Sequence, residues 1–280
     1  MYFCKSDILL RKLIEIYLKP KSFPTTMFNL KKYYFDGIDK QGNALILYYA
    51  ELKLFGFKIP YSSFILSLDE TTEEISKLRK SIIGLNNSSF SNSNLKISGN
   101  WDTQSHSISE VLWQENNSKI NWNCIVPKAE FEVEINNQMF SGLGYSEILE
   151  MNFVPWKMPI STLKWGRFLS ENHTIIWIEW IGKQPLKKVF WNGKLIEDVD
   201  IRDNEIHFKN QNTKLLFENP ISIKDEKLLQ IADSYPFLKI FFKNKFLNSR
   251  EMKFKSQSTL INPENSENGF SLYETVLWEI

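Results

Sequence analysis

Two residues in the middle of the chain have side chains that could carry out acid chemistry in an apolar site. Tyr145 and Glu147 follow two glycines at alternate positions, 142 and 144, and many of the residues around them are aromatic or aliphatic. Two glycines so placed predict a bulge or a tight bend in the backbone. A carboxyl group surrounded by tryptophan and phenylalanine loses hydration, so its pKa rises and it can donate a proton near neutral pH. The sequence therefore indicates Glu147 as a candidate proton donor and Tyr145 as the residue that orients it.

Arg167 is the third candidate catalytic residue, and it offers a second interpretation of Glu147. It follows Trp165 and Gly166, and a guanidinium can stack on an indole or bind a carboxylate through two hydrogen bonds. Buried charges need partners whether or not they are catalytic. Glu147 could therefore form a structural ion pair with Arg167 or with a lysine, and both interpretations are open at the level of the sequence.

Tryptophans near these residues are candidates for binding a ligand. The segment 122–182 is rich in them, and the chain as a whole has nine tryptophans and 14% aromatic residues. Such a content is explained either by β cores or by a cavity lined with rings. Residues two apart on a strand share a face, which places a carboxylate beside an indole at 177–179. We expect the ligand contacts to be Trp122, Trp156, Trp165, Trp177, Glu179 and Trp180.

The bulk composition argues against several classes of function. Thirty-four basic and 33 acidic side chains give a net charge of +1, which leaves no overall field to attract nucleic acid. Two cysteines and three widely spaced histidines do not predict a metal site. No phosphate loop or dinucleotide fingerprint predicts a cofactor. No segment approaches the roughly 20 apolar residues needed to cross a bilayer.

The N-terminal segment has the pattern of an amphipathic helix, Ser6–Lys19, which Pro20 ends. Charged residues interrupt its apolar positions, so it does not resemble a secretory signal, and we expect a cytoplasmic protein. A helix packed across the mouth or edge of a barrel is the favoured interpretation. Its basic residues leave peripheral contact with a membrane surface open.

Most of the remaining chain has the residue pattern of short antiparallel strands. From Ala129 to Ile135 apolar residues alternate with three glutamates, and Asn192-Gly193 is a strong hairpin signal. Two segments, Glu73–Ile83 and Asp225–Tyr235, fit a helix better, and Phe237–Phe246 fits a strand. Many short strands with few helices predict an all-β fold of sandwiches or closed barrels.

The chain divides into three parts in this interpretation. Residues 1–30 form a helix and linker, residues 31–136 a first β domain, and residues 137–280 a second β domain. The division lies at the turn signal of Asn136 and Asn137.

Several short motifs together resemble one group of proteins. They are W-N-C-x-x-P-K-A at 122–129, G-x-G-Y-x-E at 142–147, P-W-x-x-P at 155–159, L-x-W-G-R at 163–167 and Y-E-x-V-x-W at 273–278. Their order is similar to that in carotenoid 1,2-hydratase (hydroxyneurosporene synthase) and the AttH-like, lipocalin-related proteins. Tocopherol cyclase and the fungal Diels–Alderases are more distant members. The resemblance covers residues 95–182 and the terminal strand.

The resemblance implies two tandem lipocalin-like antiparallel β-barrels with a hydrophobic cavity at or between them. It also implies apolar polyene or isoprenoid substrates and acid chemistry without a cofactor. In the hydratase-like members the glycine-aromatic motif leads to an aspartate, often with a histidine nearby, whereas here it leads to Glu147 and Ile148. The positions carried over are Tyr145, Glu147, Trp165 and Arg167.

Three functions remain for such a chain. The first is a hydratase or cyclase for an isoprenoid, polyene or polyketide-like molecule, and the second is a carrier that holds a hydrophobic ligand without reacting with it. The third is a carbohydrate-binding β-sandwich, which would use exposed tryptophans. The direction in which the indoles point separates the third from the first two. The oligomeric state is not given by the sequence.

Overall fold

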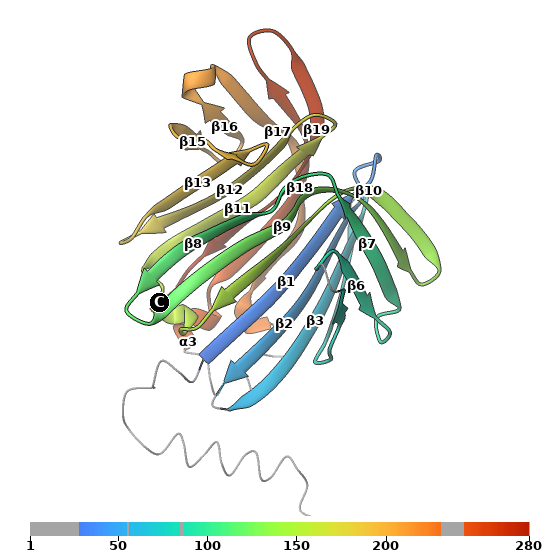
Figure 1. Ribbon diagram of the computed structural model, residues 1–280, viewed down its shortest axis with the longest axis vertical. Helices are drawn as coiled ribbons and strands as arrows, with labels where there is room; N and C mark the ends of the chain where they lie inside the picture. The colour runs from blue at the N-terminus through green and yellow to red at the C-terminus, as the bar shows by residue number, and fades with distance from the viewer. Residues whose placement is uncertain (1–27, 55, 85–86, 231–243, 280) are drawn as a thin grey trace, which may run out of the picture.

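The structure is a computed structural model, and it describes residues 28–54, 56–84, 87–230 and 244–279. Most of these residues lie in two antiparallel sheets, which Figure 1 shows side by side, the first coloured blue to green and the second yellow to red. The predicted all-β fold is therefore confirmed. The helix expected at 6–19 lies outside the described residues.

The first sheet is built from the N-terminal half of the chain. Its strands are β1 (Phe28–Ile38), β2 (Ala44–Leu54), β3 (Phe57–Leu68), β4 (Thr71–Lys77), β5 (Ile82–Ile83), β6 (Ser89–Asn92), β7 (Ile97–Thr103), β8 (Ile108–Glu115), β9 (Ser118–Ile135) and β10 (Gln138–Met151). They pair in the order β4-β3-β2-β1-β10-β9-β7-β6-β5, and β8 pairs with β9.

The second sheet follows a short 3-10 turn, η2 (Pro155–Lys157). It contains β11 (Ile160–Ser170), β12 (Thr174–Gly182), β13 (Leu186–Trp191), β14 (Lys194–Leu195), β15 (Val199–Ile201), β16 (Glu205–Phe208), β17 (Thr213–Lys227), β18 (Arg250–Ile261) and β19 (Ser266–Leu277), with a 3-10 turn η3 (Lys209–Gln211) and a helix α3 (Asn244–Leu247) between strands. The order is β14-β13-β12-β11-β19-β18-β17-β16-β15. In each sheet the first long strand pairs with the last, β1 with β10 and β11 with β19.

Hydrogen bonds made by side chains connect the two ends of each curled sheet. In the first sheet, the hydroxyl of Ser62 on β3 contacts that of Ser81 at 2.8 Å, and Ser81 accepts a bond from Asn92 on β6. In the second, the ammonium of Lys187 on β13 donates to the backbone carbonyl of Val199 on β15. The ends that lie far apart in strand order are thus close in space, as in a barrel.

Each curled sheet has its own aromatic core. Phe35, Trp101 and Phe131 fill the first, and Phe168 and Trp177 fill the second. The alternation predicted for Ala129–Ile135 is confirmed, because its apolar residues are buried here and its glutamates are exposed. A further apolar cluster lies between the sheets and includes residues from β8 to β13.

Strand β10 lies in the first sheet, between β1 and β9. The turn at Asn136 and Asn137, both with positive φ, therefore joins two strands of one sheet. The chain passes to the second sheet between Met151 and Ile160, C-terminal to the division that the sequence suggested. A strong turn signal marks a hairpin and carries no information about which sheet follows.

Three predicted elements are wrong where the structure describes them. Residues 73–77 lie in β4, because pairing with β3 outweighs their helical spacing. Residues 225–227 extend β17, where Arg250 on β18 holds Asp225 in a two-bond ion pair. Residues 244–247 form α3 and not a strand. Residues 228–230 are helical, as predicted. The remaining parts of the predicted helix 225–235 and strand 237–246, residues 231–235 and 237–243, lie outside the described residues.

A pair of glycines brings β1, β7 and β10 close together. Gly37 and Gly144 face each other across β1 and β10, and the indole of Trp101 lies over Gly144 and donates to the backbone carbonyl of Asp36 at 2.7 Å. Just beyond, the register between β9 and β10 shifts on both sides of Ser146. The bulge expected after the glycines is thus confirmed, and it leads directly into Tyr145 and Glu147.

Replacing Gly144 with alanine should destabilise the fold by about 1–3 kcal/mol, the usual cost of overpacking a core. The added Cβ would lie 2.6 Å from the Trp101 indole and 2.8 Å from the carbonyl oxygen of Asp36. Urea unfolding followed by tryptophan fluorescence measures the change. The exposed Ser141 on the same strand is the control, and equal midpoints for Gly144→Ala and Ser141→Ala would contradict the close approach.

Candidate functional site

A cavity of about 390 Å³ lies between the two sheets. Its volume falls in the usual range for sites of small molecules. Aliphatic and aromatic side chains form most of its wall, among them Leu30, Leu52, Leu149, Leu163, Trp165 and Val276. Four residues with an amine or carboxyl side chain also line it: Lys32, Glu147, Glu251 and Glu274.

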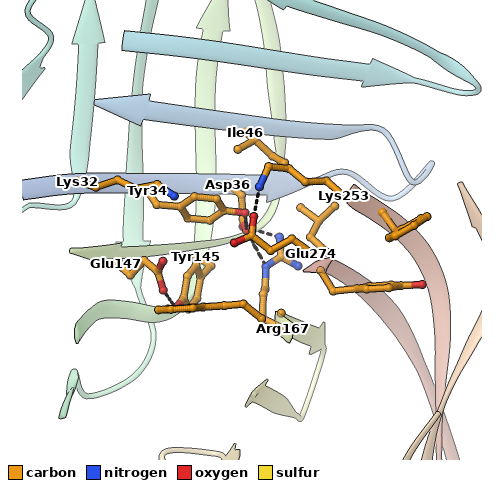
Figure 2. A pocket seen from close by; sticks show the side chains of 14 residues that line it. Lys32, Tyr34, Asp36, Ile46, Tyr145, Glu147, Arg167, Lys253 and Glu274 are labelled. Carbon is orange, nitrogen blue, oxygen red and sulfur yellow. Dashed lines mark hydrogen bonds and ion pairs between the residues drawn. The ribbon is translucent and has the colours of Figure 1, made fainter. Parts of the chain in front are cut away.

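A smaller space of about 30 Å³ adjoins the polar part of this cavity. It shares Lys32, Glu147, Trp165 and Glu274 with the large cavity. Its other polar lining residues are Tyr34, Asp36, Tyr145, Arg167 and Lys253, and most of these are labelled in Figure 2. Residues from β1, β10, β11, β18 and β19 therefore meet at one place between the sheets.

Glu147 is buried and held by two donors. The hydroxyl of Tyr145 and the indole N–H of Trp122 both donate to its Oε2 atom, at 2.5 and 2.6 Å. Burial raises the pKa of Glu147, and the two hydrogen bonds act in the opposite direction. Because both donors use Oε2, a proton on this carboxyl group resides on Oε1, and Glu147 is part of the cavity wall.

Arg167 pairs with Asp36 and not with Glu147. Its Nε atom lies 3.0 and 3.1 Å from the two carboxylate oxygens, and Nη2 lies 2.5 Å from Oδ1. The Tyr34 hydroxyl donates to Oδ2 at 2.8 Å. Burial raises the pKa of Asp36, and Arg167 and Tyr34 act in the opposite direction. Figure 2 shows this pair beside Glu147; it joins β1 of the first sheet to β11 of the second.

Two lysines near the cavity are paired with carboxylates. Lys224 lies 2.8 Å from Glu74, and Lys253 contacts both Glu251, at 2.8 Å, and Glu274. Burial lowers the pKa of Lys253 to about 8, although its partners act in the opposite direction. These pairs neutralise charge that would otherwise be unfavourable between two apolar surfaces.

Lys32 has a different environment. Its ammonium lies 4.6 Å from the ring centre of Tyr48 and 5.9 Å from that of Tyr34. Among the described residues, no carboxylate oxygen lies within 4.0 Å of it, the limit used for an ion pair. Burial lowers the pKa of Lys32, and the charges of Glu251 and Glu147 oppose this shift.

The structure brings only some of the expected ligand contacts to the cavity. Trp165 and Trp180 line it, and the indole N–H of Trp180 is buried with no hydrogen-bond acceptor in the described part of the chain. Trp122 lies behind Glu147 as its donor. Three others are elsewhere: Trp177 in the core of the second sheet, Trp156 against Phe246, and Glu179 beside Lys187 at 3.1 Å.

Sequence reasoning missed Lys32 and Asp36. The alternate positions 32, 34 and 36 place Lys32, Tyr34 and Asp36 on one face of β1, and this period-two polar pattern was a usable signal. Asp36-Gly37 instead resembled a turn. The partner of Arg167 lies 131 residues away, so no local pattern indicated it.

Among the described residues, no group of three or more histidine, cysteine, aspartate or glutamate side chains is arranged to hold a metal ion. Within the same ranges, no helix has the length and apolar character that crossing a membrane requires.

Several solved structures share this fold, and three of them are compared with this chain. A protein described as an AttH from Nitrosomonas europaea superposes with a TM-score of 0.52 at 8% identity, covering 94% of this chain and 98% of that chain. CghA gives 0.50 at 9% identity, with coverages of 90% and 89%. Kievitone hydratase from Nectria haematococca gives 0.50 at 8% identity, with coverages of 91% and 90%.

These likenesses establish the fold. The resemblance to AttH-like proteins and their fungal enzyme relatives, inferred from short motifs, is confirmed at that level. No family model matches the chain, and no curated protein matches its sequence.

The ion pair of Asp36 and Arg167 between the sheets should contribute far more to the free energy of unfolding than a surface pair does. Removing one member leaves the other charged and buried, so Asp36→Asn and Arg167→Met should each cost about 3–5 kcal/mol. The double variant should cost less than the sum. Urea unfolding of all four proteins measures this coupling. The exposed pair of Arg202 and Asp200 is the control and should contribute at most about 1 kcal/mol; additive effects at Asp36 and Arg167 would refute the coupling.

Stability should depend on pH through Glu147. Because burial raises its pKa in the folded state, the group contributes stability that is fully present below the unfolded pKa of about 4.3 and is lost as pH rises through the folded pKa. Glu147→Gln, which stays neutral, should therefore lose less stability than the wild type between about pH 5 and pH 8. Glu150→Gln on the same strand should follow the wild type. Parallel curves for all three proteins would exclude the raised pKa.

Proposed function

We propose that this protein is an enzyme of hydratase or cyclase type that acts on an apolar molecule of isoprenoid, polyene or polyketide-like class in the cavity between the sheets. The observation that carries the proposal is a buried carboxyl group on the wall of a largely apolar cavity. The fold shared with kievitone hydratase supports the same reaction class.

Glu147 has the environment of a general acid. Burial raises its pKa and so favours the protonated form that a general acid needs, and the hydrogen bonds at Oε2 direct the acidic proton to Oε1. Tyr145 and Trp122 therefore act as positioning residues. Their hydrogen bonds fix the carboxyl group of Glu147 and are not contacts with the ligand. The dyad of Tyr145 and Glu147 is the one proposed from the sequence.

The reaction begins when Oε1 donates its proton to one carbon of a substrate double bond. The other carbon becomes a cation, which aromatic faces such as that of Trp165 stabilise by cation–π attraction. In a hydratase, water adds to the cation and returns a proton to the Glu147 carboxylate. In a cyclase, a second double bond of the same molecule adds instead, and loss of a neighbouring proton to Glu147 completes the cycle.

The lack of exposed tryptophans among the described residues argues against the carbohydrate-binding alternative. All nine lie among the described residues, and none is exposed. A sugar-binding sandwich needs indole faces that are open to solvent. A carrier of a hydrophobic ligand would use the same cavity without turnover, and only an activity test separates it from an enzyme.

Filling the cavity should abolish binding of apolar molecules. Ala50 on β2 lines it, so Ala50→Trp would occupy the space that a ligand needs. We expect the affinity for N-phenyl-1-naphthylamine, measured by its fluorescence, to fall about tenfold or more, since one lost ring contact of about 1.4 kcal/mol already gives that factor. Lys53→Trp, on the exposed side of the same strand, should bind as the wild type does. Unchanged binding to Ala50→Trp would place the ligand elsewhere.

The role of Glu147 as a general acid is tested with the natural ligand. Organic extraction of protein purified from its own host, followed by mass spectrometry, supplies a compound for turnover assays. Glu147→Gln should lower kcat by about 100-fold or more, the range of general acid catalysis, while ligand affinity changes little. Glu150→Gln, on the same strand and paired with Lys31, should keep full activity. Turnover that survives Glu147→Gln would remove the acid from the mechanism, and a ligand that returns unchanged from wild-type protein would favour the carrier.

A further inference from the structure

Lys32 is the cavity residue that the proposed reaction does not use. Its side chain lines both the large cavity and the small space beside Glu147. The other two lysines of this region are each held by carboxylates, Lys224 by Glu74 and Lys253 by Glu251 and Glu274. Lys32 contacts tyrosine rings instead, so its amine is the one of the three without a close carboxylate among the described residues.

We propose that Lys32 is a nucleophilic amine that binds the carbonyl carbon of an apolar aldehyde or ketone covalently, as an iminium ion. This inference rests on the apolar cavity of the proposed function and does not require protonation of a double bond. A lysine placed in an apolar pocket is a known type of activated nucleophile, because desolvation favours the neutral amine. Burial lowers the pKa of Lys32 in this way.

The groups around Lys32 match each step of iminium formation. The neutral amine attacks the carbonyl carbon, and transfer of one proton from nitrogen to oxygen gives a carbinolamine. Glu147 then protonates the hydroxyl group, which leaves as water while the carbon–nitrogen double bond forms. One amine, one carbonyl compound and one proton give one iminium ion and one water molecule, so atoms and charges balance.

The product state is also stabilised by the residues around Lys32. Iminium formation leaves Glu147 as a carboxylate, and Glu147 lines the same small space as Lys32. The rings of Tyr34 and Tyr48 already face the Lys32 nitrogen and would face the cation by the same attraction. A neutral pair before reaction thus becomes a pair of opposite charges after it, without a net change in buried charge.

Lys253 is a weaker candidate for the same chemistry, although burial lowers its pKa to about 8. Glu251 and Glu274 both hold its ammonium. It lines only the small space of about 30 Å³, which is the volume that one water molecule occupies in the liquid. An aldehyde with an apolar chain fits the large cavity, where Lys32 ends.

The test uses decanal and sodium cyanoborohydride, which reduces an iminium ion to a stable secondary amine. The full chain is incubated with both at about pH 7, and intact mass and peptide mapping locate the decyl group. Lys31 is the matched control, because it is the neighbouring residue and pairs with Glu150 at 3.0 Å. Partial burial acts to lower the pKa of Lys31, but the contact with Glu150 acts to raise it, and the pKa lies above its ordinary value.

We expect labelling at Lys32 to exceed labelling at Lys31 about tenfold or more, because a lowered pKa leaves more of the amine in the neutral, nucleophilic form near pH 7. Lys32→Met should lose this label, whereas Lys31→Met should keep it. Lys32→Arg places a cation at this position but supplies no nucleophile. It is the second variant, to be used if Lys32→Met does not fold. Glu147→Gln should slow labelling, since it cannot donate the proton that releases water.

Labelling spread over exposed lysines, and equal in wild type and Lys32→Arg, would overturn the inference. A parallel measurement with 1-decanol, which has no carbonyl group, shows which claim has failed. If decanol displaces N-phenyl-1-naphthylamine but decanal does not label Lys32, the nucleophile is wrong and the apolar cavity stands. If decanol does not bind either, the proposed function fails together with this inference.

Discussion

The arrangement of the site depends on one buried ion pair between the two sheets. Asp36 and Arg167 are almost fully shielded from solvent, at 0% and 2% exposure, and charges so buried are tolerated only in close contact with a partner. That requirement fixes β1 against β11. Both strands also line the cavity, through Leu30 and Leu163, so the spacing of its walls follows from the same contact.

The paired charges near the cavity already include more carboxylates than cations. Two lysines, Lys224 and Lys253, face three carboxylates, Glu74, Glu251 and Glu274, and Asp36 pairs with Arg167. An additional carboxylate at Glu147 would add one uncompensated negative charge in a region of low polarity. The raised pKa of Glu147 therefore agrees with the charge balance of its whole surroundings, as well as with its own burial.

The parts of this protein that the sequence predicted are those that local patterns determine. Alternation at 129–135, the Asn192-Gly193 hairpin and the bulge before Tyr145 all depend on neighbours within a few residues. The dyad of Tyr145 and Glu147 was predicted for the same reason, because side chains two residues apart on a strand point to the same face. Contacts between sheets were not found. The partner of Arg167 and the position of Lys32 at the cavity depend on residues distant in sequence. The strand character of 73–77 depends on pairing with the preceding strand β3, which outweighs the helical spacing.

Each sheet fills its own interior with aromatic side chains, and this leaves the space for a ligand at the junction of the two. Residues that shape the ligand space are consequently distinct from those that keep either half folded. Substitutions such as those at Leu52 or Val276 would change what fits without disturbing a barrel core. A fold of this kind can diversify its ligands while its scaffold stays constant, which is consistent with identities as low as 8% among proteins that share it.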